Sequence, residues 1–117
     1  MGYITDKKKE QARRTDLIKY LQVHHPALIF EKSQGEYAFT ERTCITFYRG
    51  RDGIFRYCDH KKRMEKAVDY HGDGIRFLQE YVQGYDFPKA VSALCDFDDS
   101  EDSEINAEDF LRLQRSL

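Results

Sequence analysis

The sequence predicts a small α+β domain with an antiparallel sheet, one N-terminal helix and two C-terminal helices packed on the sheet. Three observations predict this class. Apolar residues recur at helical spacing before residue 26, short aromatic and β-branched runs follow over residues 27–60, and helical spacing returns after residue 74. At 117 residues, the chain has room for one domain and a tail.

The first predicted helix begins at Thr5 or Asp6, either of which can cap it. It is expected to end before Pro26, because a residue that precedes proline avoids the α region. Its apolar stripe consists of Ala12, Leu17, Ile18 and Leu21.

The runs A-L-I-F, E-Y-A-F-T, C-I-T-F-Y and I-F-R-Y-C within residues 27–60 predict three or four antiparallel strands. Glycine-bearing turns at 33–36 and 49–53 separate them. Residues 61–70 are polar, and A-V-D-Y at 67–70 is a candidate edge strand.

Gly72-Asp73-Gly74 predicts a tight turn that enters a helix. Asp86 is placed to cap the last of the two C-terminal helices, and Pro88 falls in its first turn, where a missing N–H costs nothing. The expected core residues of these helices are Ile75, Leu78, Tyr81, Val82, Ala90, Val91 and Leu94.

Charge divides the chain into a body and a tail. Residues 1–95, the predicted domain, hold 17 Lys/Arg against 13 Asp/Glu, whereas residues 96–117, an acidic linker with a short helix, hold eight acids and two arginines. A mildly basic body permits nucleic-acid contact. The sequence contains no long apolar run and no secretion signal, and its three cysteines are widely spaced, so we expect a reduced, cytoplasmic monomer without membrane contact.

Four segments, 16–21, 55–58 (F-R-Y-C), 72–78 (G-D-G-I-R-F-L) and 87–94 (F-P-K-A-V-S-A-L), together resemble a known family. Residues 5–95 resemble the CHC2-type zinc-binding domain of bacterial DNA primases. They are also similar to degenerate forms that precede Toprim domains in mobile-element proteins. The resemblance implies a zinc-ribbon-like sheet, contact with single-stranded DNA, and a replication protein or Toprim domain as partner.

The chain departs from that family at the metal ligands. The CxxH pair is missing, and Lys61 stands three residues after Cys58, where the family has its second cysteine of a CxxC pair. A structural zinc site needs four nitrogen or sulfur ligands, so we expect a zinc-less domain with no cofactor, held together by aromatic packing. The residues that remain as weaker zinc candidates are Cys44, Cys58, His60 and His71.

Rings and cations alternate along residues 48–63, as single-stranded nucleic-acid sites require. The candidate DNA-binding residues are Tyr48, Arg49, Arg51, Arg56, Tyr57, Lys61, Lys62 and Arg63. The alternative is an ordinary solvated strand face. No nucleophile and base are held by a third group, so we expect a binding module and no enzyme.

Two other interpretations stay open. The domain is also compatible with a protein-interaction or structural remnant whose acidic tail masks or mimics DNA. The tail further resembles a single EF-hand loop, although Ser103 replaces the usual glycine. Its candidate calcium ligands are Asp98, Ser100, Asp102, Asn106 and Asp109.

Overall fold

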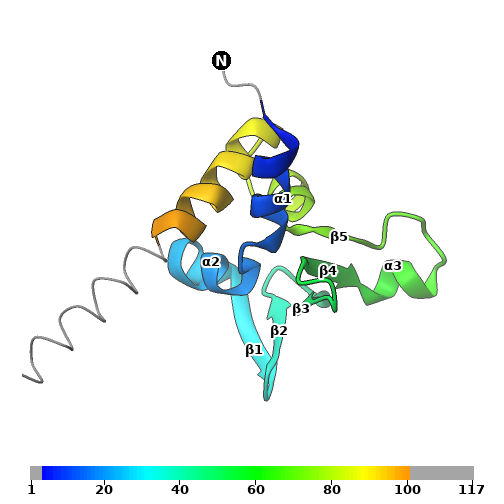
Figure 1. Ribbon diagram of the computed structural model, residues 1–117. Helices are drawn as coiled ribbons and strands as arrows, with labels where there is room; N and C mark the ends of the chain where they lie inside the picture. Colours follow the sequence, from blue (N-terminus) through cyan, green and yellow to red (C-terminus); the bar gives the residue numbers. More distant parts are fainter. Residues whose placement is uncertain (1–3, 101–117) are drawn as a thin grey trace, which may run out of the picture.

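The computed structural model describes residues 4–100 and confirms the α+β class. A five-stranded antiparallel sheet in the order β1-β2-β3-β4-β5 carries helices on one face (Figure 1). The elements are α1 (Asp6–Arg14), α2 (Leu17–His24), a 3-10 turn (Pro26–Leu28), β1 (Ile29–Ser33), β2 (Glu36–Phe39), β3 (Arg42–Arg49), β4 (Phe55–Asp59), α3 (His60–Met64), β5 (His71–Asp73), α4 (Gly74–Tyr81) and a C-terminal helix over residues 87–100.

The predicted first helix is two helices, and the single-helix expectation is wrong at Thr15. Thr5 caps α1 as expected, but Thr15 is extended and its hydroxyl donates to the carbonyl oxygens of Gln11 (2.9 Å) and Leu94 (3.2 Å). Asp16 then caps α2 by accepting from the N–H of Lys19 at 2.9 Å. A threonine and an aspartate offer the backbone these alternatives to a continuous helix.

The strands form the expected meander, with both glycine turns where the sequence predicts them. Gly35 and Gly53 have φ angles of +77° and +85°, which favour glycine. In the second turn, the Asp52 carboxylate accepts from the N–H of Ile54 at 3.1 Å. The β3–β4 hairpin is therefore a tightly defined unit.

The inner face of the sheet, which the helices cover, is an aromatic core centred on Phe77 of α4. Its ring lies 5.1 Å from that of Phe39, 4.9 Å from Phe47 and 5.5 Å from Tyr57, each edge to face. Such pairs add about 0.5–1.5 kcal/mol each to the burial of apolar area. The predicted aromatic packing is confirmed on this face.

The edge strand is displaced from its predicted position. It is β5, which pairs with β4 through Gly72 opposite Tyr57, while residues 60–70 form α3 and a return loop. Gly72-Asp73-Gly74 is thus not a turn but a strand that runs directly into α4, with Asp73 as the helix cap. A Cβ at Gly72 would lie 3.0 Å from the Tyr57 ring, so this close approach requires glycine.

The C-terminal helix begins as predicted, with Asp86 accepting from the N–H of Lys89 at 2.9 Å. It continues past the expected boundary at residue 95, because the Phe97 ring packs 5.4 Å from Tyr20 and 5.6 Å from His24. Within residues 4–100, no helix has the length and apolar character needed to cross a membrane.

Candidate nucleic-acid interface

The outer face of the sheet, opposite the aromatic core, holds two residues of the predicted DNA-binding set, Tyr48 and Arg56. Side chains alternate between faces along a strand, and Tyr48 pairs with Arg56 one position away from the buried pair Phe47 and Tyr57. Tyr48 and Arg56 therefore lie side by side on the outer face. Tyr48 is 42% exposed, enough to offer a ring to a ligand.

Tyr57 is a predicted DNA-binding residue that does not lie on the outer face. It is fully buried in the core, and its hydroxyl donates to the Glu80 carboxylate at 3.2 Å. Burial is the main reason why the pKa of Tyr57 is raised, with the Glu80 charge adding to it. Strand alternation places Tyr57 inward, so it stabilises the fold and cannot contact a ligand on the outer face.

Arg56 is held in one orientation by the hairpin turn. Its two terminal nitrogens donate to the two carboxylate oxygens of Asp52 at 3.0 and 2.8 Å. This bidentate pair raises the pKa of Arg56 and lowers that of Asp52. The guanidinium has further N–H donors, so a fixed cation stands beside the Tyr48 ring.

The other two hairpin arginines lie elsewhere. Arg49 pairs with Phe55 on the inner side of the sheet, and its guanidinium lies 5.8 Å from the centre of the Phe55 ring. Arg51 is an exposed residue of the turn. Arg49 therefore lies on the inner side and Arg51 in the turn, and neither shares the outer face with Tyr48.

The three cations of α3 also differ in exposure and in their partners. Lys62 donates to the Asp69 carboxylate at 3.1 Å, a contact that raises the pKa of Lys62. Lys61 and Arg63 are exposed, and Arg63 lies close enough to Cys58 to lower the pKa of its thiol against the larger, raising effect of burial. Arg63 thus extends the outer face toward α3.

Tyr70 is an outer-face residue that the sequence did not single out. Its ring packs 4.4 Å from that of His71, and its hydroxyl contributes to the raised pKa of Tyr48, whose main cause is burial. The carbonyl of Tyr70 accepts from the N–H of Asp59 at 2.7 Å, which brings the return loop back to β4. The sequence did not indicate this position of Tyr70, because residues 67–70 were expected to form the edge strand and the pairing of β5 with β4 was not predicted.

The zinc candidates lie near one another but have protein partners. His60 contacts the Thr46 hydroxyl at 2.9 Å and the Cys58 sulfur at 3.9 Å, and the Cys44 thiol donates to Asp59 at 3.4 Å. His71 is the strand partner of Cys58. In the part of the chain that the structure describes, no group of three or more His, Cys, Asp or Glu side chains is placed to hold a metal ion.

Asp59 lies at the centre of this region. The side chain is fully buried and accepts from Arg42 Nε at 2.7 Å, from the N–H of Lys62 at 3.1 Å and from Cys44. Burial alone would raise the pKa of Asp59, but these hydrogen bonds, led by that of Arg42, bring it below its usual value. The carboxylate therefore ties β3, β4 and α3 together.

The calcium candidates are only partly described. Asp98 and Ser100 lie in the C-terminal helix rather than in a loop, and Asp98 accepts from Gln11 Nε2 at 3.0 Å. Asp102, Asn106 and Asp109 lie outside the described residues. The two described candidates thus lie in a helix, and one of them, Asp98, accepts a hydrogen bond from another helix.

Comparisons of the chain with protein-family models, with curated proteins and with solved structures found no match.

Proposed function

We propose that this domain binds single-stranded DNA on the outer face of its sheet. The observation that carries the proposal is the neighbouring pair of an exposed ring and a fixed guanidinium, Tyr48 and Arg56, on the face opposite the core. A base can stack on the ring while the guanidinium contacts the adjacent phosphate. Stacking on one aromatic side chain contributes about 1–3 kcal/mol per base.

The surrounding charge supports an anionic ligand. Between residues 48 and 66 the chain has seven Lys/Arg and three Asp/Glu, and two of those acids, Asp52 and Asp59, are already paired with arginines. A basic track beside a stacking platform is the usual form of a sequence-tolerant single-strand site.

The proposed role is binding without catalysis. Cys58 and His60 form the nearest approach to a nucleophile and base, with 3.9 Å between sulfur and Nδ1. Burial raises the pKa of the Cys58 thiol, so the thiol stays protonated and is a poor nucleophile.

The resemblance to the primase zinc-binding domain suggests the biological setting. We propose a cytoplasmic, monomeric accessory domain of a primase-like, Toprim-associated replication system, with zinc replaced by the Asp59 network and the aromatic core. A Toprim reading frame in the same or the adjacent gene would support this setting. Co-purification with that Toprim protein would test it directly.

The binding proposal is tested by fluorescence anisotropy with a labelled single-stranded oligonucleotide at low and at moderate salt. We expect Tyr48→Ala combined with Arg56→Ala to weaken binding about tenfold or more, by the loss of one stacked base and one phosphate contact. Phe30→Ala is the matched control, since Phe30 is 38% exposed on the same face but on β1. Absence of binding at low salt would overturn the proposal, because phosphate contacts are strongest there.

A further inference from the structure

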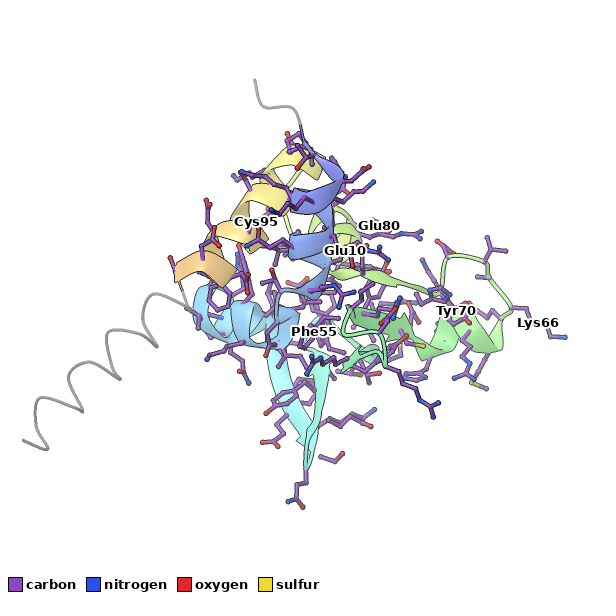
Figure 2. The ribbon with its side chains drawn as sticks, viewed as in Figure 1. Glu10, Phe55, Lys66, Tyr70, Glu80 and Cys95 are labelled. Atoms are coloured by element: carbon purple, nitrogen blue, oxygen red, sulfur yellow. The ribbon has the colours of Figure 1, made fainter. Side chains whose placement is uncertain are left out.

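Residues 60–70, here named the α3 segment, extend from the end of the sheet away from α1 and α2 (Figure 1). The base of the segment is closed by two contacts. The N–H of Asp59 donates to the carbonyl of Tyr70 at 2.7 Å, and Lys62 Nζ lies 3.1 Å from the Asp69 carboxylate. Figure 2 shows Lys66 at the outer end of the segment and Tyr70 nearer to the sheet.

Two large apolar side chains near the outer end of the segment are almost fully exposed to solvent. Met64 is 84% exposed and Val68 is 96% exposed, the highest values among the large hydrophobic residues that the structure describes. They flank a defined turn, in which the N–H of Lys66 donates to Arg63 and that of Ala67 to Lys62, each at 3.0 Å. Lys66 itself has a φ of +61°, as a tight turn requires.

The same segment is strongly cationic. Lys61, Lys62, Arg63 and Lys66 stand beside the two apolar side chains, against the acids Glu65 and Asp69, the second of which is paired with Lys62. The combination fits a partner that offers phosphates and an exposed apolar face within a few ångströms. An opened base step of DNA has this chemistry, and proteins that open such steps insert apolar side chains there.

The position of the segment favours DNA over an anionic membrane, which offers similar chemistry. Arg63 lies beside Cys58, and Cys58 follows Arg56 on the outer face of β4. The α3 segment therefore continues the proposed single-strand face past the end of β4, on the side where a bound DNA strand would leave that face.

We propose that the α3 segment is a wedge for the junction between single-stranded and double-stranded DNA. The single strand lies on the Tyr48 and Arg56 face, and Met64 and Val68 pack against the last base pair of the duplex. The inference rests on the proposed function and adds its substrate class, a single strand that continues into a duplex.

The probe is a DNA hairpin with a single-stranded extension and 2-aminopurine in its terminal base pair, which becomes more fluorescent when unstacked. We expect the full chain to raise this fluorescence and to bind the junction more tightly than the extension alone. Met64→Gln combined with Val68→Thr should lower the junction preference about fivefold, through lost apolar burial, and leave single-strand binding unchanged. Val23→Thr, at a 58% exposed valine of α2, is the matched control.

The outcomes separate the two proposals. Binding of single strands with no preference for the junction and no fluorescence change would overturn the wedge and leave the single-strand site intact. Failure to bind any of these DNAs would overturn the proposed function and the wedge with it. Binding to vesicles of anionic lipid that the double substitution abolishes, with an unaltered junction signal, would assign this end to a membrane and overturn the wedge.

Discussion

The two faces of the sheet use adjacent residues of the same strands for opposite purposes. On the inner face, Phe47 and Tyr57 pack around Phe77, and their rings are buried. On the outer face, Tyr48 and Arg56, their neighbours in sequence, remain accessible. The difference teaches that aromatic content alone does not identify a binding strand. The direction of each side chain, set by the register, decides whether a ring stabilises the domain or meets a ligand.

The sheet is also held together differently at its centre and at the end next to α3. The centre of the inner face relies on apolar area and edge-to-face rings, whereas the end next to α3 relies on one buried carboxylate, Asp59, with three hydrogen-bond donors. Apolar packing tolerates changes of pH, but a buried ion pair does not. These differences yield separate predictions for the aromatic core, for the Asp59 network and for the outer face.

The largest expected effect is at the centre of the inner face. Phe77→Ala should reduce the free energy of unfolding by about 3–5 kcal/mol, because it leaves a cavity among Phe39, Phe47 and Tyr57. Urea denaturation followed by circular dichroism measures this change. Phe30→Ala on the outer face is the control, and an equal loss there would contradict the assignment of the two faces.

Asp59→Asn should have the next largest effect on stability, about 2 kcal/mol at neutral pH, because Arg42 loses its carboxylate partner. The pKa of Asp59 is lowered in the fold, so the unfolded chain binds the proton more readily. The contribution of the Asp59 carboxylate to the free energy of unfolding is therefore present above pH 3.8, the ordinary pKa of an aspartate. It is lost as the pH falls below that value.

Thermal unfolding of the wild type and of Asp59→Asn across this pH range tests the assignment. The difference between the two should shrink as the pH falls through the lowered pKa of Asp59. A difference that stays constant with pH would show that the charge of Asp59 does not stabilise the fold.

A smaller effect, on binding alone, is expected for Arg56→Lys. Lysine keeps the charge but cannot form the bidentate contact with Asp52, so the cation beside Tyr48 is no longer fixed. Affinity for a single-stranded oligonucleotide should fall about threefold while the unfolding midpoint stays the same. Lys32→Arg on β1 is a control for cation type away from the site.

The smallest effect is expected from the acidic residues that follow Ser100. Truncation after residue 100 removes five acids and two arginines and should strengthen DNA binding about twofold through long-range charge. A much larger gain in affinity would support masking of the basic surface by the tail. Truncation after residue 95 should instead destabilise the domain, because it removes the Phe97 ring from Tyr20 and His24.

Much of the architecture was predictable from local patterns. The meander, its two glycine turns, the caps Thr5 and Asp86 and the apolar stripes of the C-terminal helices follow from periodicity and turn chemistry. The break at Thr15 did not, because it depends on the Leu94 carbonyl, far away in sequence. The edge strand β5 likewise depends on pairing with β4.

The candidate site was predictable only in outline. Composition identified residues 48–63 as a basic aromatic segment, and the structure divides that segment into the buried Tyr57, the paired Lys62, and the accessible Tyr48, Arg56 and Arg63. Tyr70 belongs to the candidate site only because the return loop is hydrogen-bonded to the end of β4.

The sequence by itself determined the fold class and the turns, because these depend on residue type and short-range spacing. Only the tertiary structure decided which rings lie on the outer face, that Lys62 is paired with Asp69, and that the buried Asp59 carboxylate is paired with Arg42. The physical reason is that facing, pairing and burial are properties of register and long-range packing, which residues far apart in the chain create together.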